Sequence, residues 1–181
     1  MMPNRGYDMT PTMYSPDGRI YQVEYALETV KRGTLAIGIM TKDGVILAVE
    51  EKTRVLQVEG ITQKIFQVDD HIGIAAAGYI PDARVQVDNA RYFSQSNKLT
   101  YDEPVDIETV AKHLADQNHQ FTQYSGVRPF GVALIIAGID RKGGNVYVID
   151  PSGTYNSYSA IAIGTGSVSY THLTLPTICS V

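Results

Sequence analysis

The spacing of apolar side chains predicts a helix near the start of the chain. It covers Arg19–Arg32 and ends at Gly33, because the apolar residues there follow a helical period: Ile20, Val23, Leu27 and Val30. Ser15–Gly18 predicts a turn before this helix, because proline presets its φ and glycine can adopt a positive φ. The residues before that turn show no period, and we predict that residues 1–14 form a mobile arm.

An alternation of period two follows the helix and predicts two hairpins. Apolar and small residues alternate over residues 35–40, a turn follows at Lys42–Gly44, and residues 45–50 form the returning strand. A second hairpin is expected over Lys64–Asp69 and Ile72–Ala77, after a loop around Gly60.

Two long helices come next in the pattern. Residues 82–97 contain no helix breaker, and this helix is expected to place Val85, Ala90 and Phe93 near one face. The other helix runs from Ile107 to about Tyr124, and Asp106 can cap it. Four apolar side chains of this helix are expected to point inward: Ile107, Val110, Leu114 and Phe121.

A third hairpin is the last element that the sequence pattern predicts. It joins a buried strand at Gly131–Ile139 to a strand at Val146–Asp150 through a turn at Arg141–Asn145. Because the strands form hairpins and the helices are grouped, the order indicates an α+β layered domain rather than a doubly wound sheet.

Composition narrows the class of protein. The chain has 181 residues, of which 44% are apolar and 19% charged, as in a globular domain. The net charge of −4 and the lack of a basic patch argue against nucleic-acid binding. The longest apolar run, Pro129–Ile139, is too short to span a membrane, and the single cysteine, Cys179, forms no intramolecular disulfide. We therefore expect a soluble cytoplasmic protein.

The end of the chain has an unusual composition. No aspartate, glutamate, lysine or arginine occurs from Pro151 to Val181. Residues 168–181 also lack a helical or strand period, and the run VSYTHLTLPT resembles the read-through translation of a sequencing adapter. We interpret this segment as a non-native tail that follows a gene cut near Ser167.

Few side chains suggest catalysis or metal binding. His113 and His119 are six residues apart on a predicted helix and do not share a face, so we expect neither a metal site nor a cofactor. If the chain were cut after Gly33, Thr34 would be an N-terminal nucleophile with Lys64 to lower its pKa. The alternative is that Thr34 only begins a strand after a helix cap.

Longer motifs resemble those of a known family. SPDGRIYQVEYALETVKRG (Ser15–Gly33), preceded by Tyr7 and Asp8, resembles the signature of archaeal-type proteasome alpha subunits. The resemblance runs from about Gly6 to Ser167 and includes further motifs: KDGVILAVEEK, QKIFQVDDHIGIAAAGYIPDAR, QYSGVRPFGVALIIAGID and DPSGTY. It implies a four-layer αββα sandwich of the N-terminal-nucleophile hydrolase type. By the same resemblance, this chain would lack the last helices and strands of that fold.

The resemblance also implies a function. Alpha subunits form a heptameric ring that caps the catalytic beta rings of the core particle in intracellular protein degradation. They retain their N-terminal segment, so the chain is expected to be non-catalytic, with Thr34, Glu50 and Lys64 as relics of the beta-type Thr, Asp and Lys.

Specific roles follow from the motif match. Four residues correspond to the cluster that holds the gating arm open: Tyr7, Asp8, Pro16 and Tyr25. Lys64 and Gly78 correspond to the pocket that binds the C-terminal carboxylate of an activating ATPase. Met9 stands where the family usually has arginine. The alternatives are a beta-type threonine peptidase with residues 1–33 as propeptide, and a free-standing amidohydrolase of the same fold.

Overall fold

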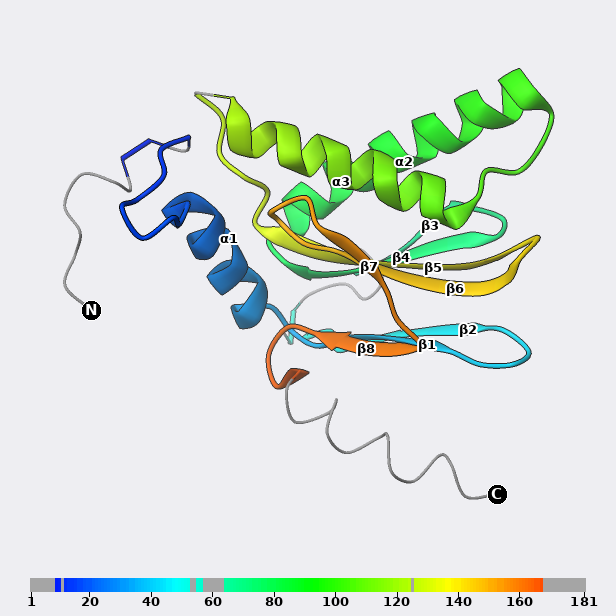
Figure 1. Cartoon of the computed structure of the whole chain (residues 1–181). Helices are drawn as coiled ribbons and strands as arrows, with labels where there is room; N and C mark the ends of the chain where they lie inside the picture. The colour runs from blue at the N-terminus through cyan, green and yellow to red at the C-terminus, as the bar shows by residue number, and fades with distance from the viewer. Residues whose placement is uncertain (1–8, 11, 53–54, 57–63, 125, 168–181) are drawn as a thin grey trace.

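The computed structural model describes residues 9–10, 12–52, 55–56, 64–124 and 126–167. In these ranges the chain forms three helices and eight strands (Figure 1). The helices are α1 (Tyr21–Arg32), α2 (Ile80–Tyr101) and α3 (Ile107–Gln123). The strands are β1 (Ala36–Met40), β2 (Val45–Val49), β3 (Ile65–Asp69), β4 (Ile72–Gly78), β5 (Val132–Asp140), β6 (Gly143–Ile149), β7 (Tyr155–Ser157) and β8 (Ala160–Ile163).

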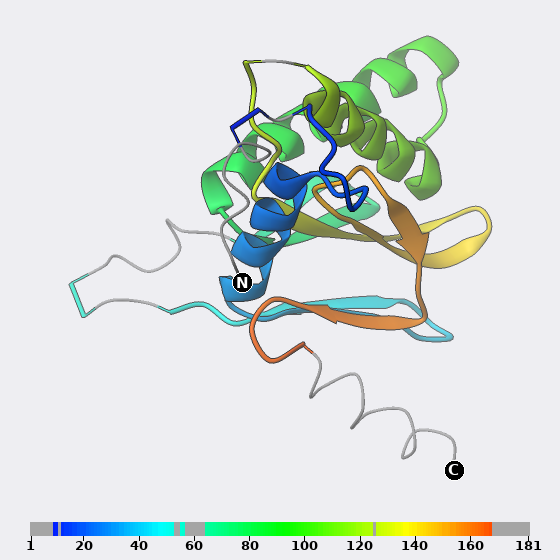
Figure 2. The same ribbon diagram turned by 60° about the vertical axis from the view of Figure 1, so that its left-hand side comes forward.

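The strands form two sheets that lie face to face. One sheet has the order β2-β1-β8 and the other β3-β4-β5-β6-β7, and every pair is antiparallel. Helices α2 and α3 cover the outer face of the larger sheet, while α1 lies at the side of the sandwich (Figures 1 and 2). The described residues therefore form an α+β sandwich of three layers, and the predicted fold class is confirmed.

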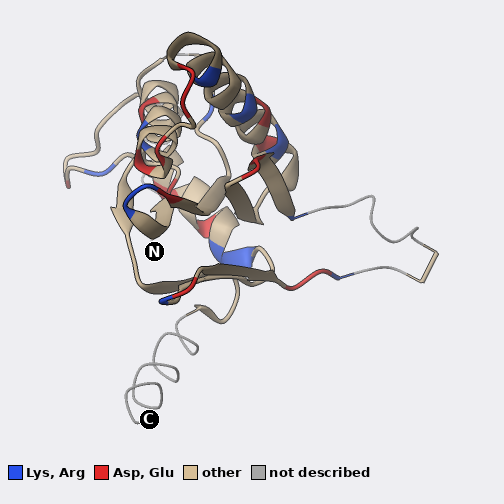
Figure 3. Ribbon diagram, turned by 90° about the vertical axis from the view of Figure 1, so that its right-hand side faces the viewer, with Lys and Arg blue, Asp and Glu red and all other residues tan. Residues whose placement is uncertain are grey.

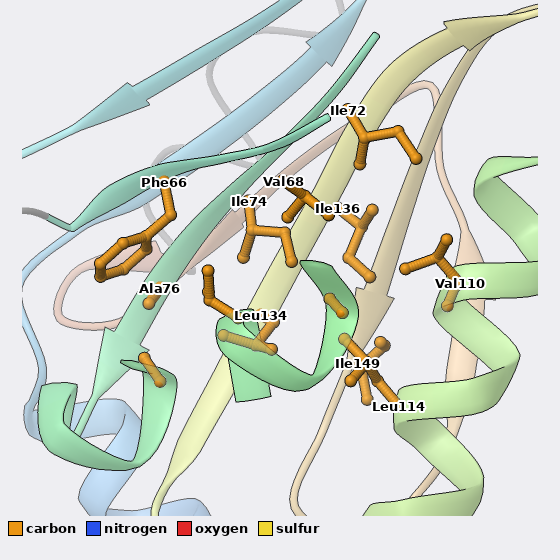
Figure 4. Close-up of a cluster of buried hydrophobic side chains, with 14 of the residues drawn as sticks. Phe66, Val68, Ile72, Ile74, Ala76, Val110, Leu114, Leu134, Ile136 and Ile149 are labelled. Carbon is orange, nitrogen blue, oxygen red and sulfur yellow. The ribbon is translucent and has the colours of Figure 1, made fainter. Parts of the chain in front are cut away.

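Two apolar clusters hold these layers together. The larger lies between α2, α3 and the five-stranded sheet, and Ile74, Leu134 and Leu114 are fully buried in it (Figure 4). The smaller lies between the two sheets and includes Ala36, Ile135 and Val146. Because β4 and β5 carry apolar side chains on both faces, they join the two clusters, as expected for strands with cover on both sides.

The three predicted hairpins are present, with small differences at their ends. β1 pairs with β2, β3 with β4, and β5 with β6. β6 begins at Gly143, so residues 143–145 belong to the strand and not to the predicted turn, because they pair with residues 138–140 of β5. The sequence pattern did not identify β7 and β8, whose three and four residues are too few to show a period.

Two predictions about the helices are wrong in detail. Val85 is 53% exposed, whereas Ala90 is fully buried, so the inward face of α2 excludes Val85. Asp106 occupies the N-cap position of α3, but its side chain makes no capping hydrogen bond. Its carboxylate instead lies 3.5 Å from Nζ of Lys142, which the β5–β6 turn brings close.

The outer face of the three-stranded sheet is apolar and has no helix over it among the described residues (Figure 1). Side chains that point away from the five-stranded sheet form two cross-strand rows: Ile46–Ile39–Ala160 and Ala48–Ile37–Ala162. Ile46, on the edge strand β2, is 54% exposed. We call these six residues the outer sheet face.

Some predictions fall outside the described residues. They concern residues 1–8 of the predicted arm, the loop around Gly60 and the segment 168–181. Among the residues that the structure describes, no helix is both long and apolar enough to cross a membrane.

Candidate functional site

Lys64 is the centre of the candidate site, just before β3. Its side chain is buried, with the residue 5% exposed. Its ammonium group donates to four oxygen atoms: Thr34 Oγ1 at 2.5 Å, Thr34 O at 2.9 Å, Leu35 O at 3.2 Å and Glu50 O at 3.2 Å. Lys64 is therefore not an exposed lysine at a strand edge, because the start of β1 and the end of β2 enclose it.

The surroundings of Lys64 also change its protonation. Burial lowers the pKa of the Lys64 ammonium, and the nearby negative charges of Glu50 and Glu51 partly oppose that effect. Glu51 also accepts a hydrogen bond at 3.1 Å from the backbone N–H of Lys64. A lysine with a lowered pKa beside a threonine hydroxyl is the arrangement used to activate a nucleophile.

Thr34 lies where α1 passes directly into β1. Gly33 caps α1, and its N–H donates to Val30 O at 3.0 Å. The carbonyl of Gly33 accepts hydrogen bonds from the N–H of Thr165 at 2.7 Å and from its hydroxyl at 2.8 Å. The carbonyl of the Gly33–Thr34 peptide bond therefore accepts two hydrogen bonds from Thr165, and the nitrogen of Thr34 is an amide.

Glu50 contributes to the site differently from the sequence expectation. Its backbone carbonyl accepts from Lys64, but its carboxylate makes no hydrogen bond or ion pair with a described residue, and the residue is exposed. The structure thus brings Thr34 and Lys64 into contact and leaves the Glu50 carboxylate at the rim.

Gly78 lies at the end of β4, beneath the C-terminal end of α1. Its φ is +120°, and an added Cβ would lie 2.4 Å from Gly131 O and 3.3 Å from the Cα of Val30. The neighbouring Gly33 likewise has no space for a side chain, since an added Cβ would lie 2.3 Å from the nitrogen of Gly78. Close approach of α1, β4 and β5 therefore requires glycine at Gly78.

The predicted gate residues are described in part. Pro16 lies in the predicted turn, which closes through hydrogen bonds from Gly18 N–H to Ser15 O at 2.9 Å and from Ser15 N–H to Arg19 O at 2.8 Å. Tyr25 lies on α1, is 53% exposed and stacks on Tyr21 with ring centroids 6.4 Å apart. Tyr7 and Asp8 lie outside the described residues.

A cavity lies beside this turn. Its volume is about 580 Å³, and it is bounded by the chain before α1, the start of α1 and the end of α3. Thr12 and Tyr14, from the predicted arm, line it together with Glu24 and His119. The last residues of the arm therefore contact the space between α1 and α3.

An ion pair that the sequence did not suggest anchors the end of the sandwich near Gly78. Asp82, on the first turn of α2, accepts from Arg128 at 2.6 and 2.8 Å and from the N–H of Gly131 at 2.9 Å. Burial alone would raise the pKa of Asp82, but the hydrogen bonds from Arg128 and Gly131 and the guanidinium charge lower it overall. Arg128 also lies over the ring of Tyr79 at 5.5 Å.

This pair could not be found from local pattern, because 46 residues separate its partners. The four acceptors around Lys64 were hidden for the same reason, since they lie 14 to 30 residues away along the chain. The presence of arginine just before Pro129 in an otherwise uncharged stretch was the one sequence signal for the pair.

Comparison with known families gives two matches. Residues 30–174 match the family described as "Proteasome subunit". Residues 7–28 match the N-terminal signature of A-type proteasome subunits, which covers the predicted gate residues and most of α1.

Curated relatives agree with these matches. The chain is 50% identical over 168 residues to the proteasome alpha subunit of Methanosarcina barkeri, a match that covers 92% of this chain and 67% of the relative. It is 50% identical to the alpha subunit of Methanosarcina thermophila, of which 68% is covered, and 49% identical to that of Methanocaldococcus jannaschii, of which 64% is covered. The chain therefore belongs to the proteasome subunit family, as an alpha-type subunit of the core particle.

Proposed function

We propose that this chain is a non-catalytic alpha subunit whose seven-membered ring controls access of substrates to the proteolytic chamber. The observation that carries the proposal is the junction between α1 and β1. A threonine nucleophile of this fold needs its own free amine as the base. In this chain α1 continues into Gly33, and the amide of Thr34 follows a carbonyl that Thr165 holds with two hydrogen bonds.

The gate is the first part of this function. Residues 1–14 form the arm, and seven arms crowd the pore of the ring. Tyr7, Asp8, Pro16 and Tyr25 hold the arm in its open position, since a phenol hydroxyl and a carboxylate can hydrogen-bond across a subunit boundary. The closed turn at Ser15–Gly18 supports this role because it fixes where the arm ends and the folded domain starts. Tyr25 supports it because the residue is 53% exposed and lies on α1, just after this turn.

Activator docking is the second part. Lys64 and Gly78 receive the C-terminal carboxylate of an ATPase activator in a pocket between subunits. Lys64 already contacts four oxygen atoms, and its ammonium has three protons to donate. A carboxylate therefore binds by replacing one of these acceptors. The hydrogen bond that Lys64 loses is compensated, because a hydrogen bond from an ammonium to a charged carboxylate is stronger than one to a neutral oxygen.

We also propose that the native sequence of this chain is cut near Ser167, inside the domain, and that residues 168–181 are not native. The run VSYTHLTLPT, which resembles the read-through translation of a sequencing adapter, supports this boundary. Sequencing the genomic locus across codon 167 tests it: a reading frame that continues with a different sequence is expected, and the same fourteen codons in the genome would contradict it.

Native mass spectrometry of the purified chain, with its genuine C-terminus restored, tests the central proposal. We expect a ring of seven subunits, each with the mass of the uncut chain, and no hydrolysis of fluorogenic peptides by the ring alone. After addition of a proteasome beta subunit, deletion of residues 2–12 should raise peptide hydrolysis, and Lys64→Ala should remove stimulation by an activator. Lys112→Ala, at an exposed position on α3, is the matched control.

One observation favours a second candidate function. The contact of 2.5 Å between Thr34 Oγ1 and Lys64 Nζ is the geometry of a beta-type threonine peptidase. Self-processing at the Gly33–Thr34 bond would give a subunit shorter by residues 1–33, together with peptide hydrolysis that Thr34→Ala abolishes. An intact subunit mass excludes this candidate.

A further inference from the structure

The chain contains two Asp-Gly steps, and both lie in turns. Asp17–Gly18 belongs to the turn before α1, and Asp43–Gly44 to the turn between β1 and β2. Both aspartates are exposed. No other aspartate or asparagine of the sequence stands before a glycine. These are therefore the two places where the sequence permits a reaction that is particular to Asp-Gly steps.

In an Asp-Gly step the aspartate side chain can react with the backbone. The glycine nitrogen attacks Cγ of the aspartate, the new N–C bond closes a succinimide ring, and the carboxyl hydroxyl leaves with the N–H proton as water. A second water then opens the ring. Opening at Cγ restores aspartate, whereas opening at the backbone carbonyl gives isoaspartate, whose chain runs through Cβ and Cγ and is one carbon longer. Glycine favours the reaction because it has no Cβ to obstruct the ring.

The turn before α1 restrains the first of the two glycine nitrogens. The N–H of Gly18 donates to Ser15 O at 2.9 Å, and the N–H of Ser15 donates to Arg19 O at 2.8 Å. The N–H of Arg19 also donates to Ser15 Oγ at 3.1 Å. Attack by the Gly18 nitrogen would have to break its own hydrogen bond and open this turn. We therefore expect the folded chain to protect Asp17.

The turn between β1 and β2 leaves the second glycine nitrogen available. The Gly44 carbonyl accepts from the N–H of Thr41 at 2.7 Å and from its hydroxyl at 2.9 Å. Within the part of the chain that the structure describes, however, the N–H of Gly44 has no acceptor. The carboxylate of Asp43 likewise makes no hydrogen bond or ion pair with a described residue. Both reacting groups can therefore meet without the loss of a contact.

The position of this turn also favours the reaction. It lies at the end of the sandwich away from α1, close to the turn between β5 and β6 (Figure 1). This end faces the viewer in Figure 3, where the smaller sheet lies apart from helices α2 and α3. Because Asp43 is exposed there, water reaches the ring that it must hydrolyse.

We propose that Asp43 is a site of isoaspartate formation in the folded chain, and that the hydrogen-bonded turn before α1 protects Asp17 from the same reaction. Modified chains carry one extra backbone carbon in a turn that sets the pairing of Met40 with Val45, so their β1–β2 hairpin is weakened. This modification goes beyond the proposed function and does not depend on it, because it needs only the folded chain and water.

The test follows isoaspartate at both steps over time. The purified full chain is kept in mildly acidic buffer below its melting temperature, because the neutral carboxyl releases water more readily, and a parallel sample is unfolded in guanidinium chloride. After digestion, an isoaspartate peptide elutes apart from its aspartate form at the same mass, resists the protease Asp-N and accepts methyl groups from an isoaspartyl methyltransferase. We expect the reaction at Asp43 to be at least fivefold faster than at Asp17 in the folded chain. In guanidinium chloride the two rates should agree within twofold.

Two variants and a matched control test the chemistry. In Gly44→Ala the added Cβ meets only Ile139 Cδ1, at 3.9 Å, and the φ of Gly44 is not positive, so the fold should be kept. The rate at Asp43 should nevertheless fall at least fivefold. Asp43→Glu should remove the modification from this turn, because the longer side chain closes a larger ring more slowly. Asp70→Glu, at an exposed aspartate that no glycine follows, should leave the rate at Asp43 unchanged.

Three results would overturn the proposal. One is a reaction at Asp17 that is as fast as that at Asp43 in the folded chain, and another is no isoaspartate at Asp43 while the unfolded chain forms it. The third is a preference for Asp43 that stays the same in guanidinium chloride, since local sequence and not the fold would then be its cause. None of these measurements depends on ring formation, so they are distinct from a failure of the proposed function.

Discussion

At the scale of single residues, Gly78 has a conformation and surroundings that both exclude a side chain. With φ at +120°, alanine is strained, and its Cβ would collide with Gly131 O at 2.4 Å. We predict that Gly78→Ala lowers the free energy of unfolding by about 3 kcal/mol or more, measured by urea denaturation.

Gly126 is the control for that prediction. Its φ is +91°, but no atom lies within 4 Å of an added Cβ, so Gly126→Ala tests backbone strain alone. We expect it to cost about 1 kcal/mol. Equal losses for the two variants would show that the contact of α1 with β4 and β5 is looser than the structure indicates.

The second prediction at this scale concerns Lys64. Lys64→Met keeps the apolar stem but leaves the carbonyl groups of Thr34, Leu35 and Glu50 without their donor. Unsatisfied buried acceptors cost about 1–3 kcal/mol in total when the site can partly relax, and we expect a loss of stability in that range in urea denaturation. Lys52→Met, at an exposed position, should change stability by no more than about 0.5 kcal/mol.

The pH dependence of Lys64 has a definite sign. Burial lowers the pKa of its ammonium, so between the lowered pKa and the ordinary value the unfolded chain binds more protons than the folded one. Stability contributed by this group therefore rises with pH across that interval. The stability advantage of the parent chain over Lys64→Met should grow from neutral to alkaline pH, and a shrinking advantage would contradict the assigned burial.

At the scale of elements, the pair of Asp82 and Arg128 ties the start of α2 to the loop before β5. We predict that Asp82→Asn destabilises the fold by about 1–2 kcal/mol, less than a fully buried pair because Arg128 is largely exposed. Asp88→Asn is the control, since the ion pair of Asp88 with Arg91 is exposed and should contribute no more than about 0.5 kcal/mol.

At acidic pH the difference in the free energy of unfolding between the parent chain and Asp82→Asn should disappear. The pKa of Asp82 is lowered in the folded state, so its contribution is complete above the ordinary pKa of aspartate and is lost as the pH falls through the lowered value. Urea denaturation at a series of acidic pH values measures this. A difference that persists at the acid end would mean that the asparagine disturbs packing rather than charge.

The elements also show what the sequence could predict. Strand-like apolar runs separated by turn residues located the three hairpins, because each strand pair is joined by a short turn. Val85 was wrongly grouped with Ala90 on one face of α2, because exposed apolar residues also recur at regular spacing along this helix. β8 was missed because its partner, β1, lies more than 100 residues earlier, where no local period can reveal it.

The candidate site was predictable in residue identity more than in geometry. Motif resemblance selected Thr34, Lys64 and Gly78, and Thr34 and Lys64 are in contact. It did not reveal that Lys64 is enclosed by carbonyl groups, since that depends on how the ends of β1 and β2 meet β3. Nor did it reveal that Gly78 is required by packing, which depends on the approach of α1.

At the scale of the whole molecule, the two sides of the sandwich differ in cover. Helices α2 and α3 shield one side, while the outer sheet face has no described helix over it (Figure 2). The six side chains of that face are all apolar. An apolar sheet face favours association with other chains when it lies next to an edge strand such as β2, which pairs on one side only with a described strand.

We therefore predict that the 181-residue chain self-associates as its concentration rises, through the outer sheet face. Ile46→Lys places a charge at the most exposed edge of that face, beside Ile39, and should weaken self-association at least tenfold in sedimentation velocity. Tyr124→Lys, which removes a comparably exposed apolar side chain from the far side of the sandwich, should leave it unchanged. If both variants weaken association equally, general charge repulsion is the cause; if neither does, the outer sheet face is covered within the chain itself. A selective effect of Ile46→Lys would establish that this face associates through apolar contact alone, because no charged side chain lies in its two rows.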